Sequence, residues 1–333
     1  MVRRYIRTEQ KYEGDVIMRK PITYLNQYIQ GKIMTYHIRH DGSIYYKNRL
    51  KTYSGKEILD GDSTNNRIAE MIRSGRPMMV CRFGSTELAT MKIFDFEVEK
   101  KYAEQMARVH TLSGLFPETT ETGKKFTELM LGCIPSADLI GIWPQAFEEY
   151  YLQEYGSDSL KCTWLESLEP WNNPQNPWSA ALAGKKVLVV HPFIDSIEAQ
   201  YQKREQIFQN TNILPEFELQ TLRSVQTAGG GSDDRFSSWF EAYEWMKEEI
   251  LKRDFDIAIL GCGAYGFPLA AAIKAAGKQA VHFGGVTQIL FGILGARWDG
   301  DEDLKKFVNA SWVRPMDKEK PKNASAVENN CYW

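Results

Sequence analysis

The stretch Ile259-Leu-Gly-Cys-Gly-Ala-Tyr-Gly-Phe-Pro268 decides the fold class, because it joins an apolar run to an alanine-rich segment. The run at Phe255–Leu260 is typical of a buried strand, and Tyr265–Ala276 is typical of a helix that ends at Gly277. Between them, Gly261-x-Gly263-x-x-Gly266 has the context of a phosphate or nucleotide turn. A strand, a glycine-rich turn and a helix in this order indicate an α/β unit.

The same alternation continues on both sides of this stretch. Helices are expected at Ile194–Gln209, behind an Asp195-x-x-Glu198 capping pattern, and at Phe236–Lys252, whose aromatic side chains recur at helical spacing. Further buried strands are expected at Pro77–Phe83, Leu139–Trp143, Lys186–Val190, Glu218–Val225 and Gln279–Phe283. This order predicts an α/β fold with a Rossmann-like, mostly parallel sheet that helices cover on both faces.

Three prolines lie within Glu169–Trp178 and prevent regular structure there. We expect this segment to connect two halves, about 61–168 and 179–315, of one α/β domain that spans residues 61–315. Open parallel sheets bind ligands beyond the carboxyl ends of their strands, so a ligand is expected in the cleft between these two halves. Residues 316–333 are expected to form a C-terminal tail, either loose or docked through its aromatic end.

Residues 1–60 differ from the rest of the chain in charge and composition. They hold 12 Lys and Arg against 6 Asp and Glu, and 8 of the 16 tyrosines. They are expected to form a small N-terminal extension with a hairpin around Asp41-Gly42. This extension either contacts an anionic lipid surface, a glycan or a protein partner, or packs on the main domain as a solvated segment. No nucleic-acid partner is expected, since the net charge of the chain is −2.

The composition is that of a globular protein, because an aromatic content of 12% excludes a disordered chain. The five cysteines are an odd number without a C-x-x-C pair, which predicts buried reduced thiols rather than a zinc site or disulfides. No apolar stretch follows the charged start, so no signal peptide is expected. Residues 280–296 are expected to be core rather than a membrane span. These features predict a cytoplasmic protein.

The first candidate site is Arg82-Phe-Gly-Ser-Thr-Glu87, where a predicted strand meets a helix. Gly84 and Ser85 stand at the helix start, whose free N–H groups suit a phosphate, and Arg82 adds a bidentate donor. Glu87 lies in the first turn. The alternative is purely structural: Ser85 caps the helix and Glu87 complements its dipole.

Other strand ends carry glycine, histidine or carboxylate groups. His191 ends one strand, and Gln226-Thr-Ala-Gly-Gly-Gly-Ser-Asp-Asp234 follows another, with Asp233 as a base, a metal ligand or a helix cap. The stretch His282-Phe-Gly-Gly-Val-Thr-Gln288 allows close backbone approach, although His282 alone also fits a satisfied core histidine. These ends share one edge of a parallel sheet, so together they predict a pocket for an anionic nucleotide derivative.

These motifs together resemble the GT-D fold glycosyltransferases, bacterial enzymes that transfer a sugar from a nucleotide sugar to a glycan acceptor. The similarity covers roughly residues 65–315. It rests on Arg82–Glu87, on His191-Pro-Phe through Arg204-Glu205, on the Gly261–Pro268 turn and on His282 through Arg297-Trp298. It implies a nucleotide-sugar donor, a glycan or lipid-linked acceptor and a role in surface polysaccharide biosynthesis. Such an enzyme would work at the inner face of the membrane, with residues 1–60 as a peripheral contact.

The expected catalytic residues are Glu87, Asp233 and His191. Nucleotide-sugar binding is expected from Arg82, Gly84, Ser85, Gly261, Gly263, Tyr265, Gly266, His282, Gly284, Gly285 and Gln288. The family pattern places Asp-x-Glu at the first strand end to hold a divalent cation, but this chain has Ser85-Thr86-Glu87. Glu87 either holds Mn²⁺ or Mg²⁺ weakly with the substrate phosphates, or Arg82 and backbone amides replace the cation, or catalysis is lost.

Two other functions stay open. The serine at position 85 fits a non-catalytic nucleotide- or glycan-binding module on the same fold. The glycine-rich turn fits a Rossmann-type oxidoreductase, but a dinucleotide site also needs an acidic residue at the end of the next strand. No Asp or Glu follows Gln279–Phe283 before Asp299, which counts against this third function.

Overall fold

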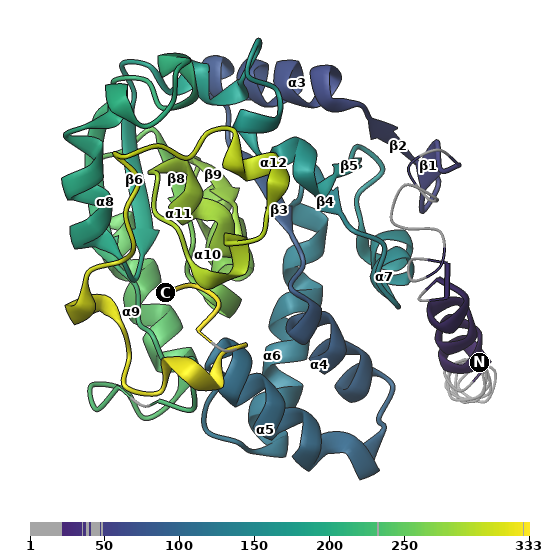
Figure 1. Cartoon of the computed structure of the whole chain (residues 1–333). Helices are drawn as coiled ribbons and strands as arrows, with labels where there is room; N and C mark the ends of the chain where they lie inside the picture. Colours follow the sequence, from purple (N-terminus) through teal and green to yellow (C-terminus); the bar gives the residue numbers. More distant parts are fainter. Residues whose placement is uncertain are drawn as a thin grey trace, which may run out of the picture.

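The computed structural model describes residues 22–34, 36–37, 40, 47, 49–231, 233–328 and 330–333. Its centre is one nine-stranded sheet with the order β1-β2-β5-β4-β3-β9-β8-β6-β7 (Figure 1). The strands are β1 (Thr52–Tyr53), β2 (Lys56–Leu59), β3 (Met78–Arg82), β4 (Leu139–Ile142), β5 (Lys161–Trp164), β6 (Lys186–His191), β7 (Glu218–Arg223), β8 (Ile257–Leu260) and β9 (Gln279–His282). Among the strands of the described residues, β1 and β2 alone pair antiparallel.

Helices cover both faces of this sheet. They are α3 (Gly61–Ser74), α4 (Ser85–Asp95), α5 (Tyr102–Ser113), α6 (Thr120–Cys133), α7 (Glu148–Tyr155), α8 (Ile194–Tyr201), α9 (Trp239–Leu251), α10 (Gly266–Ala275), α11 (Thr287–Leu290) and α12 (Glu302–Lys305). The predicted α/β fold with a mostly parallel sheet is therefore confirmed.

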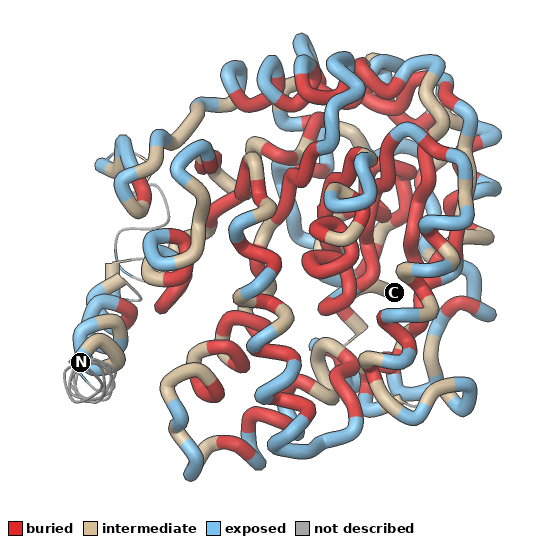
Figure 2. Tube along the Cα trace, turned by 180° about the vertical axis from the view of Figure 1, so that it is seen from behind, coloured by how far each residue is buried: buried red, intermediate tan, exposed pale blue. Residues whose placement is uncertain are grey.

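Alternation along the strands divides the core into two layers, one on each face. In β8, Ala258 and Leu260 pack with α4, α6, α9 and α10, whereas Ile257 and Ile259 pack with α3, α8 and α11. Successive strand residues point to opposite faces, so a strand that is buried on both faces must be apolar throughout. Figure 2 shows the central strands buried along their length and the outer sides of the helices exposed.

The two expected halves meet in the middle of the sheet. Strands β3, β4 and β5 come from the first half and β6 to β9 from the second, and β3 pairs with β9 through Val80 and Val281. From β3 the chain continues to β4 on one side, while β9 and β8 lie on the other. A crevice therefore forms beyond the carboxyl ends of β3 and β9, where connections leave in opposite directions.

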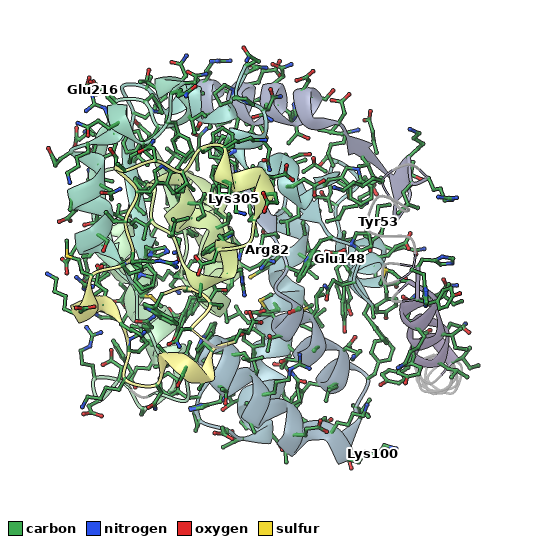
Figure 3. The ribbon with its side chains drawn as sticks, viewed as in Figure 1. Tyr53, Arg82, Lys100, Glu148, Glu216 and Lys305 are labelled. Carbon is green, nitrogen blue, oxygen red and sulfur yellow. The ribbon has the colours of Figure 1, made fainter. Side chains whose placement is uncertain are left out.

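The sheet begins before residue 61, the expected start of the α/β domain. Strand β2 pairs in parallel with β5 through Ile58 and Cys162, and β1 pairs with β2. The hydroxyl of Tyr53, which is buried, donates to Oε2 of Glu148 on α7 at 3.2 Å (Figure 3). Residues 52–59 are thus an integral edge of the sheet.

Two predicted helix boundaries are wrong. Helix α8 ends at Tyr201 instead of Gln209, and the chain then turns to bury Ile207 and Phe208 in the core. Its expected capping by Asp195 is also wrong, because that carboxylate pairs with Arg223 at 2.7 Å and Lys318 at 2.8 Å.

Helix α9 begins at Trp239, three residues later than predicted. Its N-cap is Ser238, whose side chain accepts from the N–H of Glu241, so neither Asp233 nor Asp234 caps it. The proline-rich segment contains only short 3₁₀ turns, among them Pro170–Asn172, as its prolines require.

The hairpin expected around Asp41-Gly42 lies outside the described residues. Residues 22–34 are helical, and so are residues 36–37 and 40. The five cysteines are buried and free of disulfides, as predicted. Among the residues described, no helix combines the length and the hydropathy that crossing a membrane requires.

The C-terminal tail is docked through its aromatic end. Cys331 is buried, and the backbone carbonyls of Cys331 and Trp333 accept from the N–H groups of Arg297 and Ala296 at 2.9 and 3.2 Å. Further upstream, the buried carboxylate of Glu319 accepts from the N–H groups of Asp195 and Ser196, at 2.8 and 3.3 Å, in the first turn of α8. The tail thus crosses the carboxyl edge of the sheet between two attachment points.

Candidate active site

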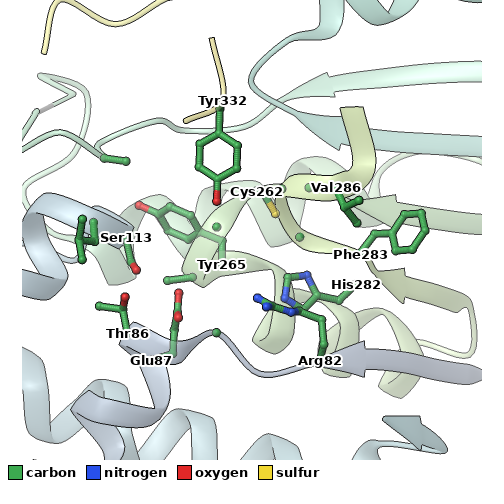
Figure 4. A pocket seen from close by; sticks show the side chains of 18 of the residues that line it. Arg82, Thr86, Glu87, Ser113, Cys262, Tyr265, His282, Phe283, Val286 and Tyr332 are labelled. Carbon is green, nitrogen blue, oxygen red and sulfur yellow. The ribbon is translucent and has the colours of Figure 1, made fainter. Parts of the chain in front are cut away.

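Four neighbouring strands end in the residues that the sequence singles out. Arg82 ends β3, His282 ends β9, Gly261 follows β8, and His191 ends β6. Because Leu260 pairs with His282 and with Val190, these ends lie at one level of the sheet. A cavity of about 700 Å³ opens beyond them, and the C-terminal tail forms part of its wall (Figure 4).

Arg82 is the principal cation of this cavity. Its guanidinium lies over the ring of Trp143 at 5.2 Å, and no hydrogen-bond acceptor contacts it among the described residues. Burial lowers its pKa, while the charge of Glu87 acts in the opposite direction. An Arg stays charged under these conditions. Its bidentate donor face is therefore available to an anionic ligand.

The start of α4 lies beside Arg82. Gly84 is the N-cap and no side chain caps this helix, so the alternative in which Ser85 caps it is wrong. The carboxylate of Glu87 folds back over Gly84, where a Cβ atom would lie 1.7 Å from Oε2. All of residues 84–87 line the cavity. The first-turn N–H groups of α4 and the Glu87 carboxylate therefore face the same space.

The residues present do not fit a resident Mn²⁺ or Mg²⁺ ion. The described part of the chain contains no group of three His, Cys, Asp or Glu side chains that could hold a metal. At the expected place, Glu87 is the single carboxylate, and the positive charge of Arg82 nearby disfavours a second cation.

His191 is a neutral hydrogen-bond donor. Burial lowers its pKa to about 3, and its Nδ1 accepts from the N–H of Phe193 at 3.0 Å. In a neutral imidazole the other nitrogen then carries the proton, so Nε2 is a donor. His191 lines the cavity in this state. It suits a ligand oxygen better than it suits the role of a base.

His282 is also neutral and packs against the glycine-rich turn. Burial lowers its pKa to about 3, with a further contribution from Arg82, and its buried Nδ1 has no hydrogen-bond partner. A Cβ atom at Gly266 would lie 2.1 Å from that nitrogen, so this position requires glycine. Strand β9 thus ends in a neutral imidazole, where a dinucleotide site places a carboxylate for the ribose.

The three glycines of the turn have different surroundings. The space beside Gly261 is filled by the side chains of His191 and Thr287, whose nearest atoms would lie 2.4 and 2.7 Å from an added Cβ. Gly263 has a φ of +58° and faces open space at the cavity. A ligand can therefore approach the backbone at Gly263. Tyr265 also lines the cavity, with its ring stacked on Trp239 at 4.5 Å.

The glycine pair Gly284–Gly285, which follows β9, contacts the C-terminal tail of the chain. Gly284, with a φ of +69°, faces Arg82, whereas an added Cβ at Gly285 would lie 2.2 Å from Cε1 of Tyr332. Gln288 donates to the backbone carbonyl of Tyr332 at 3.2 Å, and its buried Oε1 has no partner. Figure 4 shows the Tyr332 hydroxyl pointing into the cavity from the side opposite Arg82.

Several cavity residues were not among the expected site residues, although Trp143 ends a predicted strand and Arg297 lies in a stretch that carries the resemblance. They are Trp143, Glu169, Arg297, Glu328, Tyr332 and Trp333. Arg297 forms an ion pair with Glu328 and donates to the Tyr332 hydroxyl at 3.2 Å. Burial raises the pKa of Glu169 to about 8, so this side chain is mostly protonated at neutral pH. Spacing could not reveal them, because they lie in the proline-rich segment, in loops and in the tail.

Asp233 is not among the residues that line the cavity. Its carboxylate forms a bidentate pair with Arg235, with contacts of 2.9 and 2.7 Å, which lower its pKa. The preceding glycine run forms a turn in which the N–H of Gly229 donates to Thr111 at 2.7 Å. Thr227 and Ala228 of this loop reach the cavity, but Asp233 does not line it.

Neither a protein-family model nor a curated protein matches the sequence. Two solved structures are similar to the chain, each at 12% identity over 80% of this chain and 93% of the other. One, with a TM-score of 0.42, is described as a selenomethionine-substituted domain of unknown function 1792. The other, with a TM-score of 0.43, is described as the same domain, with a distinct glycosyltransferase fold. At these scores the function has to be argued from the cavity itself.

Proposed function

We propose that the protein is a glycosyltransferase, which moves a sugar from a nucleotide-sugar donor to a hydroxyl of a glycan or lipid-linked acceptor. The observation that carries this proposal is the half-buried guanidinium of Arg82, which has no hydrogen-bond acceptor among the described residues of the cavity. A guanidinium in this position attracts an anion, and the diphosphate of a nucleotide sugar supplies one.

The charges around the cavity favour a phosphate at Arg82. Arg297 is already paired with Glu328, and the two histidines are neutral at physiological pH. Arg82 is the remaining cation among the described lining residues, and the uncapped first turn of α4 lies beside it. The open backbone at Gly263 gives a second approach from the facing strand end.

The proposed transfer needs a stabilised leaving group and a base for the acceptor hydroxyl. The acceptor oxygen forms a bond to the anomeric carbon while the bond from that carbon to the diphosphate oxygen breaks, and the electron pair leaves with the diphosphate. Arg82 and the α4 N–H groups stabilise this leaving charge. Glu87 takes the proton of the acceptor hydroxyl, and His191 Nε2 donates a hydrogen bond to the substrate. Surface polysaccharide precursors, which the sequence resemblance suggests, carry such hydroxyls.

Two substitutions test the proposal, with nucleotide-sugar turnover and nucleoside diphosphate titration as measurements. Arg82→Ala should lower nucleoside diphosphate affinity about 10- to 100-fold, because hydrogen bonds to charged groups contribute about 1.5–3 kcal/mol. Glu87→Gln should retain that affinity and lower turnover about 100-fold or more. Arg235→Ala, which removes an exposed guanidinium outside the cavity, is the matched control. Unchanged binding and turnover in both test variants would refute the proposal.

A second candidate function is a non-catalytic nucleotide- or glycan-binding module. It is favoured by Ser85, which leaves Glu87 as the only carboxylate at the start of α4. A module would bind nucleoside diphosphates through Arg82 without releasing sugar from any nucleotide sugar, with or without Mn²⁺. The same titration, combined with a sugar-release assay, separates the two functions.

A further inference from the structure

The helix at residues 22–34 presents an apolar stripe to solvent. Ten large apolar side chains are exposed among the described residues, and six of them lie between residues 22 and 36. They are Ile22, Leu25, Tyr28, Ile29, Ile33 and Tyr36, with exposed fractions of 42–62%. Single exposed apolar residues need no explanation, but a continuous row of them marks an interaction surface.

The row follows one face of the helix. Ile22, Leu25, Ile29, Ile33 and Tyr36 are separated by steps of three and four residues. At about 100° per residue they span roughly 80° of the helix circumference. Such a narrow stripe is the pattern of a helix that lies against an apolar layer.

The opposite face of the same helix is already packed on the protein. The ring of Tyr24 lies 5.7 Å from that of Phe96 and 5.4 Å from that of Phe147. Gly31 is buried against Ala146, where an added Cβ would lie 2.6 Å from the Ala146 Cβ. The helix is therefore held with its apolar stripe outward, away from the sheet. Figure 2 shows the helix beside the N-terminus, at the margin of the molecule.

The N-terminal part of the sequence, to which the stripe belongs, is basic. Residues 1–40 contain eight Lys and Arg against three Asp and Glu, whereas the whole chain carries −2. Lys32, exposed on the helix, lies 5.4 Å from the ring of Tyr28 at the border of the stripe. Aromatic and basic side chains beside an apolar stripe suit the boundary between lipid headgroups and acyl chains. Each cation near an anionic bilayer surface adds to the attraction.

We propose that this helix docks the protein on an anionic membrane surface, with Ile22, Leu25, Ile29 and Ile33 inserted at the headgroup boundary. The positive charge of the segment selects an anionic lipid surface over a neutral one. This inference does not depend on the proposed function, because it rests on the outer face of the helix and on no residue of the cavity.

The test is co-sedimentation of the full chain with vesicles that contain either neutral phosphatidylcholine alone or 30% phosphatidylglycerol. We expect binding to the anionic vesicles, weaker binding at 0.5 M NaCl, and little binding to the neutral ones. The double substitution Ile29→Ser, Ile33→Ser should lower partitioning about tenfold or more, because two apolar side chains no longer enter the boundary. Leu251→Ser is the matched control, since this apolar side chain is also exposed but lies on α9.

The apolar stripe could be covered by a membrane or by a second copy of the chain. Light scattering of the protein without vesicles distinguishes the two, because it measures the oligomeric state. A monomer that binds anionic vesicles supports the proposal. A dimer that the double substitution dissociates would overturn it, and so would equal partitioning of the wild-type and double-substituted chains. Circular dichroism of both variants checks that the substitutions leave the fold unchanged.

Discussion

The ring of Tyr332 lies against the α-carbon of Gly285, so closely that a Cβ atom at position 285 would stand 2.2 Å from Cε1 of the ring. The glycine follows β9 at the carboxyl edge of the sheet, and the tyrosine belongs to the C-terminal tail. Gly295 repeats this relationship, because an added Cβ there would lie 2.6 Å from the carbonyl oxygen of Cys331. The wall of the cavity is thus built from two segments that only glycine allows to meet.

The first prediction follows from this contact. Gly285→Ala should lower the free energy of unfolding by about 1–3 kcal/mol, because the methyl group overpacks against Tyr332. The cost should be smaller in a Tyr332→Ala background, where the ring is absent, and a thermal double-mutant cycle measures the difference. Gly132→Ala is the control, since position 132 in α6 has open space around it. An identical cost in both backgrounds would contradict the contact.

The second prediction concerns Glu169, whose pKa burial raises to about 8. Above this pH the side chain ionises and brings a negative charge into the cavity for which we propose an anionic ligand. Nucleoside diphosphate affinity should therefore fall about fivefold to tenfold between pH 7 and pH 9.5. Calorimetric titration across this range should show the fall in the wild type and not in Glu169→Gln.

Glu57→Gln serves as the control for Glu169, because this exposed carboxylate on β2 pairs with Lys161 and does not line the cavity. It should leave the pH dependence of binding unchanged. If Glu169→Gln shows the same alkaline fall as the wild type, another group is responsible.

The third prediction concerns the buried carboxyl group of Glu148. Burial raises its pKa from 4.5 to about 8, and the hydrogen bond from Tyr53 opposes the shift only in part. The folded state then binds a proton that the unfolded state has released. The stabilising contribution is fully present below about pH 4.5 and is lost as the pH rises through 8.

Glu148→Gln should therefore gain stability relative to the wild type as the pH rises from 5 to 8, on the order of 3 kcal/mol across the window. Urea denaturation at several pH values measures this difference. Glu154→Gln, at an exposed position of the same helix, should show no such trend. A difference that is constant with pH would show that Glu148 is ionised in the folded state throughout.

The fourth prediction concerns Glu319, which joins the tail to α8. Its carboxylate accepts from the N–H groups of Asp195 and Ser196 and from the Ser196 hydroxyl. Glu319→Ala should lower the free energy of unfolding by about 2 kcal/mol, because a helix start loses its cap and buried donors lose their acceptor. Hydrogen exchange should increase in the first turn of α8 and in the tail. Glu302→Ala, which removes an exposed carboxylate, should change stability by less than about 0.5 kcal/mol.

The central part of the fold could be predicted from the sequence because its strands are apolar on both faces. The run at Ile257–Leu260 is an example, since each of its side chains enters one of the two core layers. Strands β2 and β5, toward one end of the sheet, could not be found in this way. In β2 and β5, Glu57 is exposed and the charged residues Lys56 and Lys161 are half-buried, so these short runs look like loops until their pairing is known.

The candidate site was predictable to the extent that parallel strands bring their carboxyl ends together. Arg82, His191 and His282 follow apolar runs, so the sheet alone places them around one cavity. Tyr332 and Glu169 reach the same cavity through tertiary contacts that no local pattern encodes. Asp233 shows the opposite case, because Arg235 two residues later holds its carboxylate away from the lining.

The carboxylate of Glu319 affects where an anion can bind at the carboxyl edge of the sheet. Helices α4, α8 and α10 all start at the same edge of the sheet, and each start attracts negative charge. At α8 the carboxylate of Glu319 already supplies that charge, so a solute anion does not bind at this helix start. The phosphate of the proposed donor can then bind at the starts of α4 and α10. These two helix starts lie beside Arg82 and Gly263. An intramolecular carboxylate at one helix start thus restricts anion binding to the other two helix starts.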